Sequence, residues 1–272
     1  MDWKNLFTPV ASLTAAEAAD FMARRKSADY QLLDVRQPKE YEAGHLAGAK
    51  LIPVKELPER VAELERDKPV IVYCAVGGRS RAAAQFLAGK DFAEVFNLNG
   101  GIKAWEGQQA TGPAEAGLEL LIGTQDYPEA VALAYAMEDG LQRFYRRLAV
   151  RAGETEQRML YERLAAFEER HKERLMAAYR QKHGSSAMPA RSADVVEGGI
   201  GLETLLARAG APGESGREIL EFAMALETQA LDLYGRLASR SDSALTRDFF
   251  LSMADEEKEH LGFLARELER LL

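Results

Sequence analysis

The chain has 272 residues, a formal net charge of -8 and a pI near 5.3, with 47% hydrophobic and 29% charged residues. This length exceeds what one hydrophobic core usually organises, so we expect two domains. The acidic balance argues against a nucleic-acid partner, because phosphate binding needs a basic face. No apolar run approaches the roughly 20 residues of a membrane span, and no signal-peptide pattern opens the sequence. One cysteine allows no internal disulfide, so we expect a cytoplasmic protein with no membrane partner.

The first domain, expected at residues 1–108, alternates short apolar runs with helical patterns. We predict strands at 30–36, 69–74 and 93–98 and helices at 14–25, 56–65 and 80–90. Strands that alternate with helices indicate a parallel α/β sheet. Glycine, proline and glutamine then interrupt this rhythm, and we place a linker at 109–124.

The remaining residues, 125–272, have a purely helical pattern. Four long amphipathic helices are expected at about 128–151, 155–182, 215–239 and 243–271. The stretch 183–214 between the second and third is irregular, apart from a short helix at 202–209. A connection this long inside a four-helix bundle runs along the bundle, which predicts an all-α ferritin-like fold.

The helical half contains an internal repeat of acidic residues. In each copy a Glu is followed by Tyr at i+7, by a second Glu at i+30, and by His three residues after that Glu. The two copies are Glu138, Tyr145, Glu168, His171 and Glu227, Tyr234, Glu257, His260. Residues at i and i+3 share a helix face, and residues equidistant from a hairpin turn lie at one height. We therefore expect each helical hairpin to bring two Glu and one His together.

These acids lie within the apolar stripes of their helices. A solvated carboxylate belongs on the opposite face, and four buried carboxylates repel one another unless cations neutralise them. Two divalent ions balance four Glu charges, with the two imidazoles neutral. Oxygen and nitrogen ligands of this kind suit iron or manganese, with zinc also possible.

The segments "MEDGLQRFY", "ALETQALDLY" and "DEEKEHLGFL" resemble the rubrerythrin family over about 125–272. The resemblance implies two iron ions in a di-iron carboxylate site and an oxidoreductase that acts on peroxide or O2. It implies as metal ligands Glu138, Glu168, His171, Glu227, Glu257 and His260. Tyr145 and Tyr234 either hydrogen-bond the ligand carboxylates or simply pack in the core. Rubrerythrins also carry a four-cysteine rubredoxin site, which this chain lacks, so an external electron donor is expected.

The only cysteine, Cys74, ends the apolar run "VIVY" and opens a glycine-rich loop. Open α/β sheets build their sites at such carboxyl ends of strands. Gly77 and Gly78 allow the backbone N–H groups to point inward as an anion nest. The following helix and Arg79 add positive charge, and each factor lowers a thiol pKa. This context favours a nucleophilic thiolate over an inert buried cysteine.

The segments "LLDVRQPKEYEAGHLAGAKLIPV", "YCAVGGRSRAAAQFLA" and "VFNLNGGIKAW" resemble a single-domain rhodanese. The resemblance implies a sulfurtransferase in which Cys74 carries sulfane sulfur as a persulfide. Arg79 would bind an anionic donor such as thiosulfate, and a thiol or a protein would accept the sulfur. The implied persulfide cradle comprises Ala75, Val76, Gly77, Gly78 and Ser80.

The spacing between Cys74 and Arg79 distinguishes this loop from that of cysteine phosphatases. Cysteine phosphatases place five residues between Cys and Arg, whereas four separate Cys74 from Arg79, which makes a smaller cradle suited to sulfur. The remaining signature residues are expected to be structural, as ion pairs, hydrogen bonds or end packing. They are Asp34, Arg36, Glu40, His45 and Trp105.

Taken together, the two halves predict a bifunctional enzyme, with a sulfurtransferase joined to a di-iron oxidoreductase. An alternative hypothesis makes the helical half a non-catalytic metal-binding or sensing module that regulates or targets the rhodanese. A third interpretation, a metal-free dimerisation unit, conflicts with the inward-facing glutamates. Ferritin-like domains often dimerise, so a homodimer is a further expectation.

Overall fold

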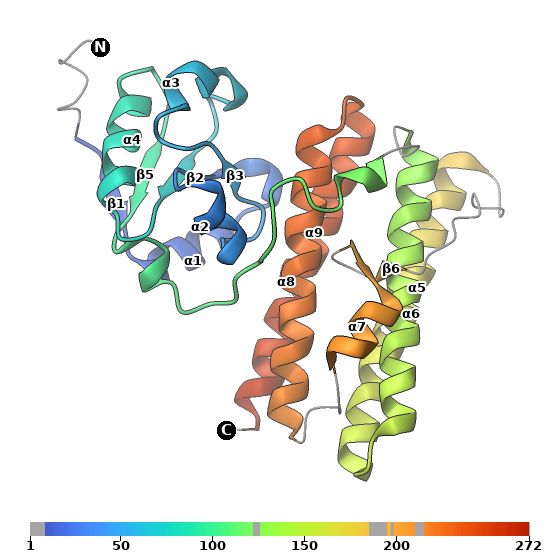
Figure 1. Ribbon diagram of the computed structural model, residues 1–272. Coiled ribbons are helices and arrows are strands. Elements are labelled where there is room, and N and C mark those ends of the chain that lie inside the picture. Colours follow the sequence, from blue (N-terminus) through green and yellow to red (C-terminus); the bar gives the residue numbers. More distant parts are fainter. Residues whose placement is uncertain (1–8, 122–125, 185–194, 197–198, 210–214, 272) are drawn as a thin grey trace. The chain divides into compact units, whose positions relative to one another are not determined.

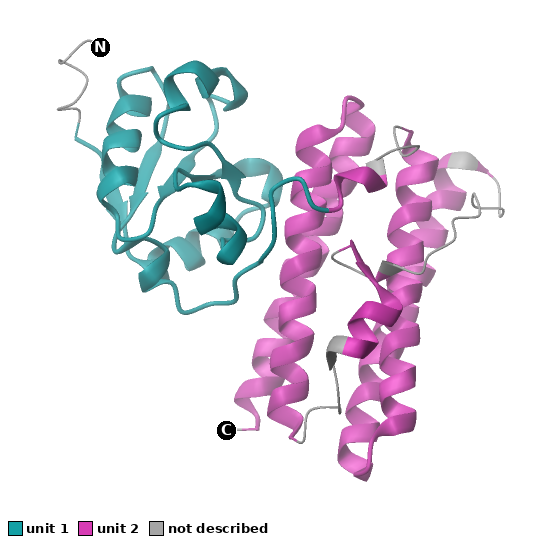
Figure 2. Ribbon diagram, in the orientation of Figure 1, with its two compact units in different colours: residues 1–116 teal, residues 117–272 magenta. Residues whose placement is uncertain are grey.

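The computed structural model describes residues 9–121, 126–184, 195–196, 199–209 and 215–271. The chain divides into two compact units, Met1–Ala116 and Gly117–Leu272, which Figure 2 shows in different colours. The division falls within the segment 109–124 that the sequence suggests as a linker.

The first unit is built on a five-stranded sheet of order β1-β5-β4-β2-β3, with every pairing parallel (Figure 1). Its strands are β1 Ala11–Leu13, β2 Gln31–Asp34, β3 Lys50–Leu51, β4 Val70–Tyr73 and β5 Val95–Leu98. Its helices are α1 Ala15–Ala23, α2 Pro38–Ala43, α3 Leu57–Arg60 and α4 Gly78–Ala88. The three predicted strands correspond to β2, β4 and β5, while β1 and β3 have too few residues to leave a periodic signal.

Alternation along β4 gives the sheet a core on each face. Val70 and Val72 pack with residues of α3 and α4 in one apolar cluster, and Cys74 continues on that face. Ile71 and Tyr73 point the other way, into a cluster with residues of α1 and α2. Because side chains alternate along a strand, Cys74 emerges at the carboxyl end of the sheet on the side that α4 covers.

The second unit contains four long helices, α5 Tyr127–Arg151, α6 Thr155–His183, α8 Gly216–Arg240 and α9 Ala244–Glu269. Their ends agree with the predicted helices to within two residues. The predicted short helix is present as α7 Leu202–Ala209. The unit is not entirely helical, because β6 Val195–Val196 and β7 Ile200–Gly201 form a small antiparallel pair beside α7. The rest of the predicted crossover 183–214, apart from the end of α6, lies outside the described residues.

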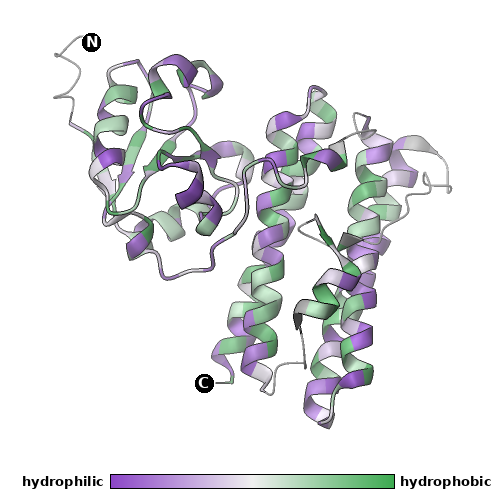
Figure 3. Cartoon of the chain, viewed as in Figure 1, coloured by the Kyte–Doolittle hydropathy of each residue, from purple (hydrophilic) through white to green (hydrophobic). Residues whose placement is uncertain are grey.

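The long helices pack as two hairpins, α5 with α6 and α8 with α9, which also meet through α5 with α9 and α6 with α8. Figure 3 shows hydrophobic and hydrophilic residues alternating along each of these helices, as expected for amphipathic packing. Capping fixes two of the helix starts. The Ser215 hydroxyl accepts from the Glu218 N–H in a capping box, and the Ser243 hydroxyl accepts from the Thr246 N–H.

The bundle interior has two apolar layers separated by a polar one. One layer includes Met137 of α5 and Ala254 of α9. The other includes Leu141 of α5 and Leu264 of α9. Between these limits lie Glu138 on α5 and both Glu257 and His260 on α9, so the fold itself holds residues of the repeat in a layer across the core. Among the described residues, no helix is both long enough and apolar enough to cross a membrane.

Candidate thiol and metal sites

Cys74 lies directly after β4 with 1% of its surface exposed. Its sulfur accepts a hydrogen bond from the Gly77 N–H at 3.2 Å and lies 3.5 Å from the Ser80 hydroxyl. Gly77 has φ +98°, a left-handed conformation that favours glycine, and it caps the start of α4. The loop therefore curls so that its backbone N–H groups and the first turn of α4 surround the sulfur.

This surrounding lowers the pKa of the Cys74 thiol. Burial is the largest single influence and opposes ionisation. Hydrogen bonds from the Ser80 hydroxyl and from the backbone N–H groups of Ser80, Val76 and Gly77 outweigh it. Hydrogen bonds to the charged form favour that form, so the loop favours a thiolate. Of the predicted cradle residues, Gly77 and Ser80 are buried, Ala75 is half-buried, and Val76 and Gly78 are exposed, with Val76 at 62%.

Arg79 forms a two-point ion pair with Glu40 at the edge of this loop. Its terminal nitrogens donate to the two Glu40 oxygens at 2.7 and 2.6 Å. Both side chains are about one-third exposed (36% and 35%). The hydrogen bonds from Arg79 lower the pKa of Glu40 to about 2. An anion that approaches Arg79 therefore meets a guanidinium whose charge is already partly balanced.

A second loop supports the backbone of the thiol loop. The Ile102 N–H donates to the Cys74 carbonyl at 2.9 Å, and the Lys103 N–H donates to the Ala75 carbonyl at 3.2 Å. Gly101, with φ +61°, lies so close that a Cβ atom would be 2.3 Å from the Cys74 carbonyl oxygen. The glycine pair in "NGG" is the signal in the sequence for this contact.

Four of the five signature residues expected to be structural make structural contacts, whereas Glu40 pairs with Arg79. Arg36 forms a buried ion pair with Asp34 at 2.6 Å and also donates to the Gly44 carbonyl at 2.6 Å. The His45 ring stacks on Tyr41, and its Nδ1 lies 2.9 Å from the Tyr41 carbonyl oxygen. Trp105 is half-buried and donates to the Gln108 carbonyl at 3.2 Å.

The second candidate site is the polar layer of the bundle. The structure places the six predicted ligands in two groups of three, each fully buried and each with its ligand atoms within 4.8 Å of one another. One group comes from α5 and α6 and the other from α8 and α9. The groups are Glu138, Glu168, His171 and Glu227, Glu257, His260.

The two groups have matching geometry and meet at their histidines. His171 Nδ1 lies 3.3 Å from a Glu138 oxygen, and His260 Nδ1 lies 3.3 Å from a Glu227 oxygen. Within the helices, each Nδ1 also lies 3.4 Å (His171 to Glu168) or 2.8 Å (His260 to Glu257) from the second carboxylate. The two rings stack with centroids 3.9 Å apart, so the layer is continuous across both hairpins.

The chemistry of this layer fits a pair of metal ions. None of the four oxygens of Glu138 and Glu168 accepts a hydrogen bond from a described residue, although all are buried. Burial raises the pKa of Glu138 to about 8 and raises that of Glu168 well above its usual range. The pKa of Glu227 is lowered, because hydrogen bonds with His260 and Glu257 outweigh its burial. Four buried carboxylates in one layer are costly alone and well suited to cations, and the mixed oxygen and imidazole set suits iron, manganese or zinc.

Two aromatic side chains, Phe167 and Phe263, cover the histidine side of the layer. The half-buried Phe167 contacts His171 and His260 edge-on, with ring centroids 4.5 and 4.8 Å apart. Phe263 stacks on Phe167 at 5.5 Å. Tyr145 and Tyr234 are fully buried in the apolar layers on either side. Their hydrogen bonding to the ligand carboxylates stays a prediction.

The repeat is broken by a polar cluster on the first hairpin. The buried ammonium of Lys172 lies 2.9 Å from Asp139 and 2.9 Å from the Gln142 side chain. The repeat-equivalent positions of Lys172 and Gln142 are Leu261 and Leu231. A polar residue in one copy where the other copy has leucine is the sequence signal for this cluster.

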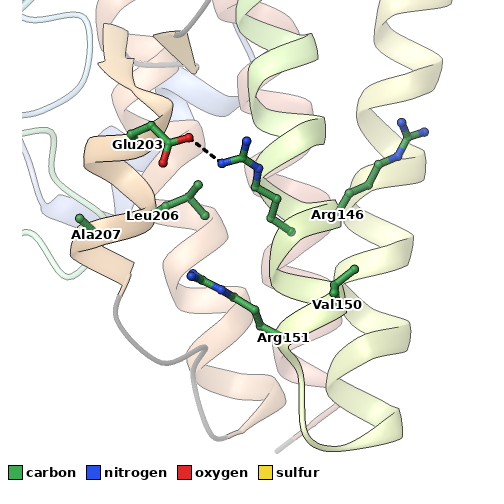
Figure 4. Close-up of a pocket in the computed structure, with 7 residues that line it drawn as sticks. Arg146, Val150, Arg151, Glu203, Leu206 and Ala207 are labelled. Atoms are coloured by element: carbon green, nitrogen blue, oxygen red, sulfur yellow. Dashed lines mark hydrogen bonds and ion pairs between the residues drawn. The ribbon is translucent and has the colours of Figure 1, made fainter.

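A surface pocket of about 590 Å³ lies between α5 and α7 (Figure 4). Its lining includes Arg146, Val150 and Arg151 from α5 and Leu206 from α7, and Arg147 pairs with Glu203 at 2.6 Å. It contains neither the thiol nor any of the six buried acids and histidines.

Comparisons with known proteins agree with this division of the chain. The rhodanese-like domain family matches residues 17–108, and the rubrerythrin family matches 95–179 and 218–271, together more than half of the chain. The uncharacterized protein YqhL of Bacillus subtilis is 47% identical over 78 residues, which are 29% of this chain and 62% of YqhL. The thiosulfate sulfurtransferase GlpE of Ectopseudomonas mendocina is 36% identical over 84 residues, which are 31% of this chain and 74% of GlpE. A rhodanese-like domain protein of Staphylococcus aureus has a solved structure that is 28% identical and matches 38% of this chain and 98% of its own, with a TM-score of 0.35.

Fold and sites thus define a two-part protein, with a thiol in a glycine-rich loop on a parallel α/β sheet and a buried carboxylate–histidine layer in a helical bundle. The chain belongs to both matching families, as a rhodanese-like domain fused to a rubrerythrin domain.

Proposed function

We propose that the chain is a bifunctional enzyme, a sulfurtransferase that works through a Cys74 persulfide and a di-iron carboxylate oxidoreductase that acts on peroxide or O2. The observation that carries the first activity is the position of the Cys74 sulfur within its loop, where it accepts from the Gly77 N–H at 3.2 Å and lies 3.5 Å from the Ser80 hydroxyl. The observation that carries the second is the buried layer of four Glu and two His, in which the oxygens of Glu138 and Glu168 accept no hydrogen bond from a described residue.

In the sulfur transfer, the Cys74 thiolate attacks the outer sulfur of thiosulfate. A Cys74 S–S bond forms, the S–S bond of thiosulfate breaks, and sulfite leaves with the electron pair. An acceptor thiolate then attacks the outer persulfide sulfur, takes it, and returns Cys74 as a thiolate. The loop N–H groups that favour the thiolate also favour the anionic persulfide. Arg79 attracts the donor dianion, in competition with Glu40.

In the helical unit, Glu138, Glu168 and His171 would hold one ion and Glu227, Glu257 and His260 the other. Two bound ions of a redox-active metal supply two-electron chemistry toward peroxide or O2. The apolar layers on both sides exclude bulk water from these side chains, and Phe167 and Phe263 cover the histidines. With one cysteine in the chain, the electrons come from an external donor.

The first activity is tested by Cys74→Ser in a thiosulfate sulfur-transfer assay. We expect transfer to fall to background, because the hydroxyl cannot carry sulfane sulfur. Transfer that survives in Cys74→Ser would refute the persulfide route. The second activity is tested by peroxide and O2 consumption of the fully metallated protein with several electron donors, and an absence of turnover with all of them contradicts it.

A second candidate function is a regulatory one, in which the helical unit binds metal without turnover and controls or targets the sulfurtransferase. The observation that favours it is the lack of any cysteine besides Cys74 with which to build an internal electron-transfer site. It predicts that metal loading changes the rate of sulfur transfer while peroxide and O2 are not consumed.

A further inference from the structure

Behind Cys74, a chain of hydrogen-bonding side chains runs across the sheet to β1. The Ser80 hydroxyl lies 2.7 Å from the Asn97 amide oxygen and 3.5 Å from the Cys74 sulfur. The Asn97 amide nitrogen lies 3.4 Å from the Ser12 hydroxyl. Ser80 and Asn97 are 0% and 1% exposed. The sulfur-transfer steps above assign no role to Asn97.

The sheet register builds this chain. Asn97 of β5 is the register partner of Ser12 of β1 on one side and of Val72 of β4 on the other. Val72 stands two residues before Cys74, so the Asn97 side chain and the sulfur lie on the same face of the sheet. Ser80 lies above them in the first turn of α4. A buried amide in a strand of apolar neighbours is costly unless it is hydrogen-bonded, and Ser80 and Ser12 supply those bonds.

Ser80 has one hydroxyl hydrogen and two acceptors within reach. When Cys74 is a thiol, its S–H can donate to Ser80 Oγ, and Ser80 can donate to the Asn97 oxygen. When the sulfur is anionic it only accepts, so Ser80 Oγ loses the S–H donor and Ser80 can turn its own hydrogen toward the sulfur. In that orientation Ser80 no longer donates a hydrogen bond to the Asn97 oxygen. The Ser80 Oγ, which no longer accepts from the S–H, can accept a hydrogen bond from another donor.

An amide can resolve this conflict by turning over. Rotation of the Asn97 side chain by half a turn places its N–H₂ toward Ser80 Oγ and its oxygen toward Ser12. The Ser12 hydroxyl can accept in the first arrangement and donate in the second. The two orientations of an amide have the same shape, so the protein environment selects one by hydrogen bonding alone.

We propose that Asn97 is a positioning residue for Cys74 and that its side-chain amide reverses when the sulfur becomes anionic. When Cys74 is a thiol, Ser80 donates its hydrogen bond to Asn97. When Cys74 is a thiolate or a persulfide, Ser80 donates it to the sulfur. The proton lost by the thiol goes to solvent, and every other hydrogen stays on its own atom. The S–H···O bond of the thiol is exchanged for an O–H···S bond, and Asn97 takes part in one N–H···O bond and one O–H···O bond in both arrangements. The persulfide half of this statement rests on the proposed sulfurtransferase function, whereas the thiol–thiolate half does not.

The reversal can be observed directly, because the sequence has asparagine only at positions 5, 97 and 99. Protein labelled with ¹⁵N-asparagine gives three side-chain amide signals, which NMR can follow as pH is raised. We expect the Asn97 signal to shift with the same midpoint as Cys74 alkylation by iodoacetamide, while Asn99, which is exposed, stays still. In Ser80→Ala the Asn97 shift should collapse. An Asn97 signal that does not move, or that moves equally in Ser80→Ala, overturns the proposal.

A double-variant cycle gives a second test. Asn97→Asp keeps the side-chain size, but a carboxylate only accepts and so holds the Ser80 hydrogen away from sulfur. We expect Ser80→Ala to raise the alkylation pKa of Cys74 by about one unit, since a hydrogen bond to a charged acceptor is among the stronger ones. Asn97→Asp should raise it further, through the lost bond and through charge repulsion. In the double variant, the rise in the alkylation pKa of Cys74 should be about one unit smaller than the sum of the rises in the two single variants. The reason is that without the Ser80 hydroxyl there is no Ser80–sulfur hydrogen bond for the carboxylate introduced at position 97 to remove.

The control is Asn99→Asp, which adds the same charge two residues along the chain at an exposed position and should change the pKa little. Additive effects of the two substitutions, or no effect of Ser80→Ala, contradict the proposal. Thermal melts report whether Asn97→Asp is folded, and if it is not, the NMR titration of the native chain and of Ser80→Ala decides. Alkylation of the only cysteine does not require sulfur transfer. The alkylation and NMR results therefore remain interpretable even if the chain proves not to be a sulfurtransferase.

Discussion

The thiol loop illustrates what single residues contribute. Cys74, Arg79 and the cradle are predictable from one short stretch, because a cysteine at a strand end followed by glycines and a helix has few other uses. Asn97 is not predictable as part of the site in the same way. Its closeness to the sulfur comes from the pairing of β4 with β5 and of β5 with β1, and strand register is not written in the local sequence.

The pH dependence of thiol reactivity follows from the lowered pKa of Cys74. The thiolate reacts and the thiol does not, so the alkylation rate should rise with pH with a midpoint below the pKa of a free cysteine, about 8.5. Glu40, with a pKa of about 2, stays ionised over this range, so one titration should dominate. The same chain unfolded in denaturant provides the reference. A folded-state midpoint at or above that reference would contradict the role of the loop.

The ion pair between Arg79 and Glu40 predicts an effect on substrate binding. Glu40→Gln removes the carboxylate that competes with thiosulfate for Arg79. We expect the KM for thiosulfate to fall by about fivefold with little change in kcat, the effect of about 1 kcal/mol for a partly exposed pair. Glu42→Gln, exposed and two residues away, is the control. A rise in KM instead would mean that Glu40 holds Arg79 in its binding position.

At the scale of elements, the long helices are predictable from the sequence and the short strands are not. The helices of the bundle repeat their apolar pattern over many turns, and the spacing of the acids from the hairpin turns is enough to place them at one level. β3 has two residues, too few to show any periodicity. The contact of Phe167 with both histidines is not predictable either, because it depends on how α6 and α9 pack, which the repeat does not encode.

The loop that supports Cys74 gives a prediction at this scale. Gly101→Ala should destabilise the protein and disturb the thiol loop, because the new Cβ would lie 2.3 Å from the Cys74 carbonyl oxygen at φ +61°. Gly48→Ala is the matched control, since Gly48 has φ +76° but no atom within 4 Å of the added Cβ. The control should cost about 1 kcal/mol from its backbone conformation alone. Chemical denaturation and Cys74 alkylation measure both effects, and equal losses in the two variants would contradict the close contact.

At the scale of the whole molecule, the chain joins two units that each contain one candidate site, the thiol loop in one and the two Glu, Glu, His groups in the other. The change from alternating strands and helices to purely helical patterns reveals this division in the sequence. We expect the two proposed activities to be separable, because no residue of the thiol loop belongs to either Glu, Glu, His group, and Cys74 and those six residues are buried in the cores of their own units.

The most direct test of two separate sites is the metal content per chain of anaerobically purified protein, measured together with sulfur transfer on the same samples. For the native chain we expect about two iron ions, one for each Glu, Glu, His group. Glu138→Ala with Glu257→Ala should lose this metal and keep Cys74-dependent sulfur transfer. The control is Glu162→Ala with Glu256→Ala, neither of which belongs to either Glu, Glu, His group, and it should retain both. A native chain with little metal, unchanged by the substitutions, would contradict the account and leave the helical unit as a structural partner of a sulfurtransferase.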